Sequence, residues 1–98
     1  MGQNIMHDWT LLSILYEWKS ARVTISFRCE TAEMASIVAN GVTALRIPQT
    51  REWGPSVSVN KVTGPKSIAE GGNKLEIQMQ SGDVIEIVAA EYIFPVQA

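Results

Sequence analysis

The stretch that decides the fold is Lys-Leu-Glu-Ile-Gln-Met-Gln-Ser-Gly-Asp-Val-Ile-Glu-Ile-Val-Ala, residues 74–89. On both sides of the central Gln-Ser-Gly-Asp, apolar side chains alternate with mostly polar ones, which is the period of a β-strand with one buried face. The apolar set at odd positions consists of Leu75, Ile77, Met79, Ile85, Ile87 and Ala89. The pattern predicts a β-hairpin whose odd-numbered side chains face the core.

The register of this hairpin follows from the same alternation. Odd positions must lie opposite odd positions, so the loop must contain an odd number of residues. A Gln-Ser-Gly loop at residues 80–82 puts the glycine where a left-handed residue forms the bulge of a three-residue hairpin. We therefore expect Ile77 opposite Ile85, and Glu76 opposite Glu86 at a cost of roughly 0.2–1 kcal/mol. A loop that starts one residue later is the alternative and keeps the same face inward.

Two further strands are predicted near the N-terminus. Residues 9–18 are apolar on both faces, which suits a central strand or one covered on both sides. Residues 22–29 alternate more cleanly, with an apolar face that consists of Val23, Ile25, Phe27 and Cys29. The matching face of the first strand consists of Leu12, Ile14, Tyr16 and Trp18. A four-residue turn at 19–22 would place Tyr16 opposite Ile25, a favoured pairing of an aromatic with a β-branched residue.

The segment at residues 31–39 fits two structures. Its first half has helical propensity, and a helix there would end at the following glycine. As strands, the Asn40-Gly41 pair is the favoured turn of a two-residue hairpin that joins residues 34–39 to 42–47. We favour the hairpin and keep one short helix near 31–39 as the alternative.

The remaining segments complete an all-β pattern. We expect a loop at residues 48–55, a short strand at 56–62, a long flexible connection at 63–73 and a last extended segment at 92–96. Six to eight short strands separated by turn signals indicate an antiparallel sandwich or a small barrel.

Composition limits the class of protein. The chain has 98 residues, of which 46% are hydrophobic, so we expect a single β domain over 1–98, in which 1–8 resembles a disordered leader. The formal net charge of -2 argues against general nucleic-acid binding. No membrane-length apolar run and no basic region before an apolar run occur, so no membrane association and a cytoplasmic location are expected.

Positive charge gathers in the middle of the chain. Residues 46–66 carry a net charge of +3, and residues 67–98 carry a net charge of -4. A large aromatic in a charged loop beside Gly-Pro is costly to expose without purpose, and Trp and Arg are the residue types that anchor interfaces. The candidate binding residues are Arg46, Arg51, Glu52, Trp53 and Lys61. The alternative is that Trp53 folds back and plugs one end of the domain.

Catalytic and metal chemistry is weakly supported. His7 and Asp8 are neighbours, and in an extended chain neighbouring side chains point to opposite faces, which disfavours their pairing as a general base and its orienting acid. Cys29 lies on the apolar face of its strand, which indicates a core residue rather than a nucleophile. A lone His and a lone Cys do not make a standard zinc site. We therefore predict no catalytic residue, no metal site and no cofactor.

Three pieces of the chain carry a resemblance to a known family. They are His7-Asp8-Trp9 with the apolar strand after it, Trp53-Gly54-Pro55-Ser56 leading into Val57-Ser58-Val59-Asn60, and Met79-Gln80-Ser81-Gly82-Asp83. Over about residues 6–91 the chain resembles a family of short uncharacterised bacterial all-β proteins. It is more distantly similar to small immunity proteins of bacterial toxin systems. The resemblance implies a bacterial, soluble, non-enzymatic protein and assigns no catalytic residue.

These observations support three functional hypotheses. The first is a non-catalytic module that binds another protein, as an inhibitor or immunity-like protein would, through the side formed by residues 46–66. The second is a structural homodimer without a ligand, joined through a strand edge or an apolar patch. The third, which we rank lowest, is a small enzyme that uses His7, Asp8 and Cys29.

Overall fold

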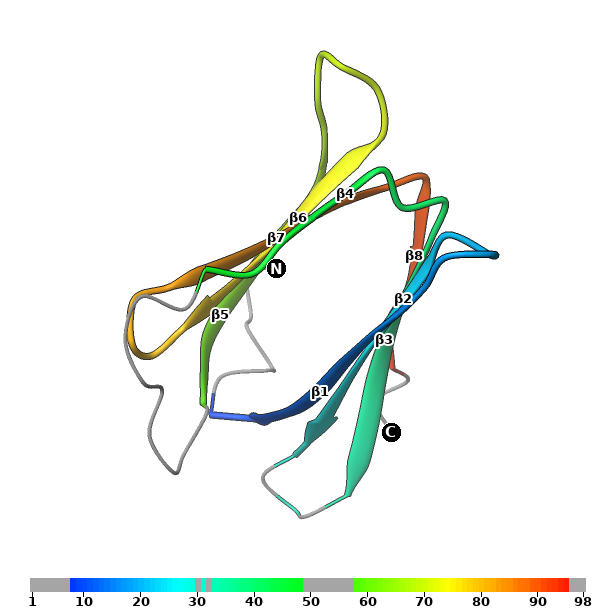
Figure 1. Cartoon of the computed structure of the whole chain (residues 1–98). Coiled ribbons are helices and arrows are strands. Elements are labelled where there is room, and N and C mark those ends of the chain that lie inside the picture. The colour runs from blue at the N-terminus through cyan, green and yellow to red at the C-terminus, as the bar shows by residue number, and fades with distance from the viewer. Residues whose placement is uncertain (1–7, 30, 32, 49–57, 96–98) are drawn as a thin grey trace.

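The computed structural model describes residues 8–29, 31, 33–48 and 58–95 of the chain. In this part, eight strands form two antiparallel sheets of four strands each and no helix occurs (Figure 1). The strands are β1 (Thr10–Glu17), β2 (Arg22–Arg28), β3 (Met34–Asn40), β4 (Ala44–Arg46), β5 (Val59–Ser67), β6 (Asn73–Met79), β7 (Val84–Ala89) and β8 (Glu91–Ile93). The sheet orders are β1-β2-β3-β8 and β4-β7-β6-β5. The all-β prediction is confirmed, and the chain forms the sandwich rather than the barrel.

The hairpin of β6 and β7 has the expected register. Ile77 lies opposite Ile85, and Glu76 lies opposite Glu86. Gly82 has a φ of 101°, the left-handed conformation that the three-residue loop requires, and its N–H donates to the Met79 carbonyl at 2.9 Å. Of the two loops that the alternation allows, the preferred one at residues 80–82 is therefore confirmed.

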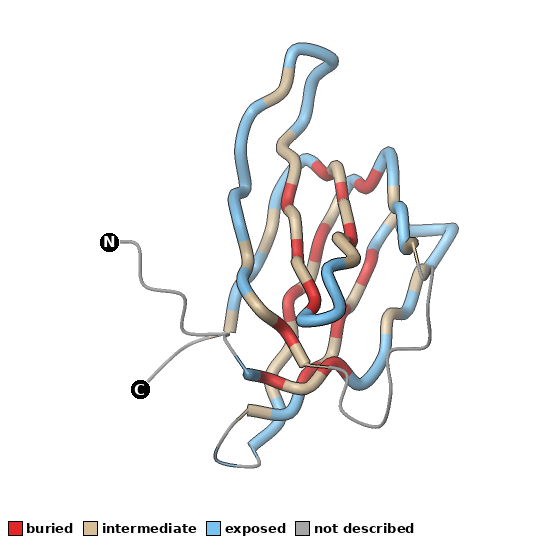
Figure 2. Tube along the Cα trace, turned by 90° about the vertical axis from the view of Figure 1, so that its left-hand side faces the viewer, coloured by how far each residue is buried: buried red, intermediate tan, exposed pale blue. Residues whose placement is uncertain are grey.

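The core lies between the two sheets, where the buried positions of both face each other (Figure 2). Among the described residues it contains no buried polar or charged side chain. Its members are Trp9, Leu11, Val23, Ile25, Phe27, Ile37, Ala39, Val42, Val59, Leu75, Ile77, Met79, Ile85, Ile87 and Ala89. The predicted inward faces of β2, β6 and β7 are confirmed, while Cys29, just after β2, is half-buried against the core.

The predicted pairing of β1 with β2 is wrong by two residues. Tyr16 lies opposite Val23 rather than Ile25, and the turn occupies residues 18–21 instead of 19–22. As a result Trp18 leaves the strand and its side chain is 82% exposed. Cross-strand pair preferences favoured the predicted register, with Tyr16 opposite Ile25. Each such pair contributes only about 0.2–1 kcal/mol, so the packing of the core can override these preferences.

A β-bulge changes the inner face at the start of β1. The register shifts between Leu11 and Ser13, which leaves Leu12 as an extra residue. Leu11 therefore enters the core at 9% exposure, while Leu12, which we expected to share a face with Ile14, is 40% exposed. A bulge inverts the alternation within a strand, and an apolar run such as Leu-Leu gives no sign of it in the sequence.

The expected hairpin of residues 34–47 is wrong, although its first half is a strand. β3 pairs with β2 and β8, while β4 pairs with β7 in the other sheet. The segment between them crosses from one sheet to the other and is held by backbone hydrogen bonds from Val42 N–H to Ala21 O and from Thr43 N–H to Val88 O. The helix alternative for this stretch is also wrong, because Met34–Asn40 is extended.

The flexible connection expected at residues 63–73 is wrong as well. β5 continues through Gly64-Pro65 to Ser67, pairs with β6 and leaves a loop only at residues 68–72. Because β5 is an edge strand, proline is tolerated there without the loss of a ladder hydrogen bond. The strand predicted at 56–62 is confirmed in its described part, with Val59 wholly buried; Val57 lies outside the described residues.

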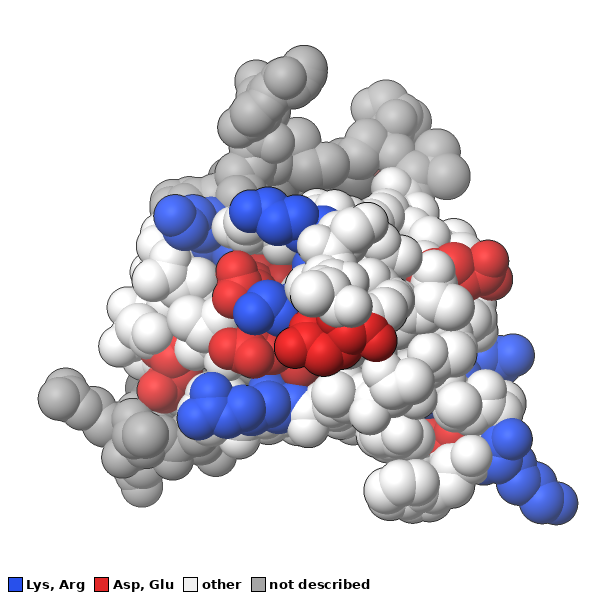
Figure 3. All heavy atoms as spheres, turned by 90° about the horizontal axis from the view of Figure 1, so that it is seen from above, with Lys and Arg blue, Asp and Glu red and all other residues white. Residues whose placement is uncertain are grey.

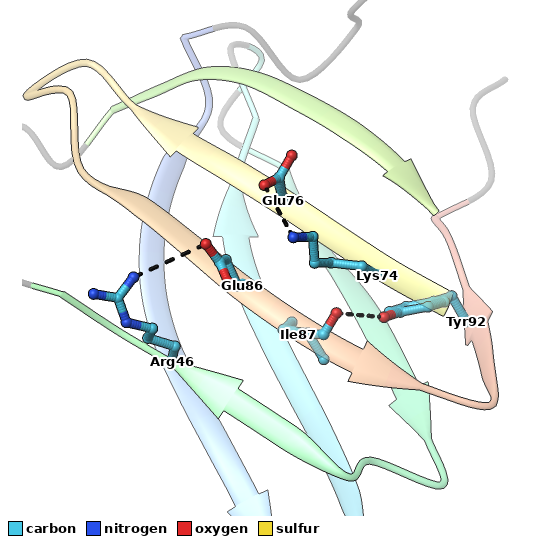
Figure 4. A network of polar contacts seen from close by, with 6 residues as sticks. All are labelled: Arg46, Lys74, Glu76, Glu86, Ile87 and Tyr92. Carbon is cyan, nitrogen blue, oxygen red and sulfur yellow. Dashed lines mark hydrogen bonds and ion pairs between the residues drawn. The ribbon is translucent and has the colours of Figure 1, made fainter. Parts of the chain in front are cut away.

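The last extended segment, predicted at 92–96, is confirmed in part as β8, which covers Glu91–Ile93 and joins the edge of the first sheet beside β3; Val96 lies outside the described residues. The Tyr92 side chain points from β8 toward the other sheet (Figure 4). Its hydroxyl donates to the carbonyl oxygens of Asn73 at 2.7 Å and Ile87 at 2.9 Å. Burial raises the pKa of this hydroxyl, although backbone groups of Leu75 and Ala89 oppose the rise. Tyr92 therefore ties the two sheets together.

Candidate functional site

The outer face of the β1-β2-β3-β8 sheet begins with a row of polar side chains across all four strands. Glu17 lies opposite Arg22, Arg22 opposite Asn40, and Asn40 opposite Glu91. The Arg22 guanidinium lies 3.9 Å from the Glu17 carboxylate and donates through Nε to Asn40 Oδ1 at 3.2 Å. Asn40 Nδ2 in turn donates to Glu91 Oε2 at 3.4 Å. The four side chains of this row are thus linked to one another across the sheet.

The next two rows of this face carry no charge. Leu15 lies opposite Thr24, Thr24 opposite Val38, and Val38 opposite Ile93. Beside this row lie three serines, and we name the two rows together the neutral strip: Leu15, Thr24, Val38, Ile93, Ser13, Ser26 and Ser36. Leu15 and Ile93 are 55% and 56% exposed. Beyond the strip, Arg28 lies opposite Met34, which is 68% exposed.

An aromatic pair stands at the β1 side of the same sheet. The rings of Tyr16 and Trp18 stack with their centroids 4.4 Å apart. Tyr16 is half-buried, and the Trp18 ring is held over it in the turn, open to solvent. A large exposed aromatic that is already positioned by a neighbour can join an interface with little loss of conformational entropy.

The outer face of the other sheet is charged in a different way. Glu76 and Glu86 are directly opposite each other, and each carboxylate has its own cation: Lys74 at 3.8 Å from Glu76, and Arg46 at 3.9 Å from Glu86 (Figure 4). The upper surface of the molecule shows acidic and basic side chains interleaved (Figure 3). The predicted like-charge pair is therefore real, and it is compensated by Lys74 on the same strand as Glu76 and by Arg46 on the strand beside Glu86.

Two depressions lie over this charged sheet. The larger has a volume of about 540 Å³ and lies between the crossing segment, at Gly41 and Ala44, and the loop at residues 68–72. Glu70 is the one charged residue among the described residues that line it. The smaller, of about 270 Å³, lies between Lys66 and Glu76. Without several convergent polar groups, the larger depression has little with which to orient a small ligand.

The structure describes two of the five predicted binding residues, Arg46 and Lys61, and it does not bring these two together. Arg46 on β4 and Lys61 on β5 lie on the two opposite edges of one sheet, with β7 and β6 between them. Three strand spacings separate them, about 14 Å. Arg46 is moreover paired with Glu86. Arg51, Glu52 and Trp53 lie outside the described residues, so both their recognition role and the plug alternative stay predictions.

Of the three residues named for the enzyme hypothesis, the structure describes Asp8 and Cys29. The Asp8 carboxylate accepts a hydrogen bond from Gln80 Nε2 at 2.6 Å, which ties the start of the first sheet to the β6–β7 turn. Partial burial, together with the nearby Glu33 carboxylate, raises the pKa of the Cys29 thiol, the opposite of what a nucleophile needs. His7 lies outside the described residues.

Within the described ranges, no group of three or more His, Cys, Asp or Glu side chains is placed to hold a metal ion. The same part of the chain also contains no helix long and apolar enough to span a membrane.

The neutral strip was not anticipated from the sequence. Leu15 and Ile93 lie almost eighty positions apart in the chain, on the two edge strands of one sheet. One signal was present: Thr24 and Ser26, the outward residues in the middle of β2, are uncharged, whereas β6 carries Lys and Glu on its outward face. No protein-family model, curated protein or solved structure matches the chain.

Proposed function

We propose that this chain is a non-catalytic module that binds another protein, and that it does so through the neutral strip. The observation that carries the proposal is the contrast between the two outer faces. One sheet has charges along its face, with Arg46, Glu86, Glu76 and Lys74 close together. The other has an uncharged centre between Arg22 at one end and Arg28 at the other.

An uncharged centre within a polar rim is the anatomy of a protein–protein interface. The strip spans a sheet face, and both depressions described above lie over the other sheet, so a protein surface suits it better than a small molecule. Leu15 and Ile93 are large apolar side chains left more than half exposed on this face. Covering them would remove apolar surface from water, which supplies a driving force for association.

The surroundings of Asp8 and Cys29, two of the candidate catalytic residues, also support a non-catalytic binding module. Asp8 is engaged by Gln80, and the Cys29 thiol has a raised pKa. An inhibitor or immunity-like role is the finer proposal within this class, since the family resemblance implies a non-enzymatic bacterial protein. In that role the partner would be the protein that this chain inhibits.

The test compares one substitution on each sheet. Thr24→Lys places a charge in the middle of the neutral strip, and Thr63→Lys places the same charge on the outer face of the other sheet, opposite Glu76. A protein captured by the immobilised wild-type chain would be purified and its affinity measured by calorimetry. We expect Thr24→Lys to raise Kd at least about tenfold, a loss typical of a central interface position, and Thr63→Lys to change it less than about twofold.

Thermal unfolding of both variants provides the control for folding. If Thr63→Lys weakens binding while Thr24→Lys leaves it unchanged, the binding surface lies on the charged sheet and this assignment is wrong. If the wild-type chain binds no protein with measurable affinity, the proposal that it is a protein-binding module is wrong.

A further inference from the structure

The sandwich has four edge strands, and three of them carry features that block pairing with another chain. β4 and β8 are only three residues long. β5 contains Pro65 between two lysines, Lys61 and Lys66, and its ladder with β6 is interrupted by two register shifts. Short length, proline, lysine and bulges are the means by which natural sheets prevent edge-to-edge association.

The fourth edge, β1, lacks most of these features. It is eight residues long, Thr-Leu-Leu-Ser-Ile-Leu-Tyr-Glu, without proline or lysine, and its one charge is at Glu17, the last residue. Among the described residues it pairs with β2 on one side and makes a single bridge, from Thr10 to Ser58, on the other. The bulge lies near its start, so residues 13–17 form a regular ladder with β2. No described residue pairs with the other side of residues 13–17, so that side offers backbone donors and acceptors to a further strand.

Side chains at this edge are apolar as well. Leu15 is 55% exposed and Leu12 is 40% exposed. The stacked pair of Tyr16 and Trp18 adds aromatic surface at the end of the strand, where Tyr16 lies opposite Val23 and hence on the inward side. An exposed edge that combines free backbone groups with apolar side chains is the geometry of strand addition.

We propose that β1 pairs antiparallel with β1 of a second copy of this chain about a two-fold axis. The two sheets would join into one of eight strands, with Leu15 opposite Leu15 of the second copy. This register places Ile14 opposite Tyr16 on the inner side twice, a favoured kind of cross-strand pair. It also places Glu17 opposite Ser13, so that no like charges face each other.

Pairing with a second copy has a further consequence for the outer face of the sheet. Two-fold antiparallel pairing centred on a residue keeps outward side chains beside outward side chains. The outer faces of both copies would therefore form one continuous surface, in which the two neutral strips lie side by side. The inference goes beyond the proposed function, because it concerns the edge of the sheet and needs no other protein.

The first experiment measures the mass of the chain alone by sedimentation over a dilution series, for wild type, Leu15→Lys and Ile93→Lys. The two substitutions are matched, because both positions lie in one cross-strand row with 55% and 56% exposure, on the two edges of the sheet. We expect a wild-type dimer that dissociates on dilution. Leu15→Lys would oppose two like charges and raise the dimer Kd at least about tenfold, while Ile93→Lys would match wild type.

The second experiment is site-specific cross-linking in a Cys29→Ser background. With Leu15→Cys, two thiols face each other across the axis within reach of a disulfide, so copper phenanthroline as oxidant should give a covalent dimer. Ile93→Cys, equally exposed on the other edge, should give none. A cross-link of equal yield at both positions would indicate random collision and overturn the proposed pairing.

A wild-type chain that remains monomeric at all concentrations would also overturn the proposed pairing of β1 with a second copy. The β1 edge would then be a site for an extended segment of a different protein. Loss of dimer in Ile93→Lys but not in Leu15→Lys would move the interface to the β8 edge. Because sedimentation is performed without any partner, these results stand apart from the Thr24→Lys binding test. Failure of one proposal therefore does not imply failure of the other.

Discussion

Single side chains on β6 and β7 define the centre of the core. Ile77 and Ile87 are wholly buried, so truncating either one to Ala should leave a cavity as well as remove apolar contacts. We expect each variant to lose about 2–5 kcal/mol of unfolding free energy in urea. Glu76→Ala, on the outward side of the same strand, should cost less than about 1 kcal/mol, because its ion pair with Lys74 is solvent-exposed. If both Ile variants unfold at the urea midpoint of the wild type, Ile77 and Ile87 do not lie at the centre of the core.

The Cys29 thiol gives a second test at the scale of one residue. Partial burial and the Glu33 carboxylate both disfavour the thiolate and raise the pKa of the thiol. A disulfide reagent at neutral pH should therefore label the folded protein at least about tenfold more slowly than the urea-unfolded chain, and labelling should begin at higher pH. Glu33→Gln removes one of the two causes and should speed labelling. Equal rates for the folded and unfolded chain would show that the thiol is freely reactive.

At the scale of elements, the pairing of β5 with β6 depends on a close approach of two backbones. A Cβ added at Gly64 would lie 2.6 Å from the carbonyl oxygen of Lys74, while one added at Gly71 would meet nothing within 4 Å. The two glycines have almost the same positive φ, 100° and 99°, so they share the conformational penalty of an L-residue. The pair thus separates backbone strain from contact across the ladder.

We predict that Gly64→Ala loses more stability than Gly71→Ala, by about 1–3 kcal/mol, the range for forcing extra volume into a packed site. Urea unfolding of both variants measures the difference. Equal losses would mean that β5 does not approach β6 as closely at Gly64 as the structure shows, and that the strand ends before it.

At the scale of the whole molecule, the proposed pairing through β1 makes stability depend on protein concentration. A dimer that dissociates on unfolding is stabilised by mass action, so its melting temperature rises with concentration. For a chain of this length, a hundredfold increase in protein concentration should raise the Tm of the wild type by about 5 °C. The Tm of Leu15→Lys should not change with concentration. Calorimetric scans over that range provide the measurement, with Ile93→Lys expected to follow the wild type. A constant wild-type Tm would contradict the dimer.

The sequence by itself determined the pairing of β6 with β7, whereas the observed pairing of β1 with β2 lies two residues away from its prediction. In β6 and β7, strict alternation and the glycine of the turn favoured the register that places Ile77 opposite Ile85, and the structure has it. The inward face of β2 and the all-β class followed from the same period of two. These features depend on residues close in sequence, whose backbone and side-chain preferences act before any distant contact forms.

Tertiary structure decided what depends on residues far apart. Asn40-Gly41 favours a tight turn, yet the chain crosses there to the other sheet, because β8 takes the place beside β3 and β7 takes the place beside β4. The bulge that exposes Leu12 depends on how β1 packs over the core. The neutral strip depends on β1 and β8 becoming the two edges of one sheet, which brings Leu15 and Ile93 into one row. Local propensity cannot specify such a row, because only the order of strands in the folded sheet brings its members together.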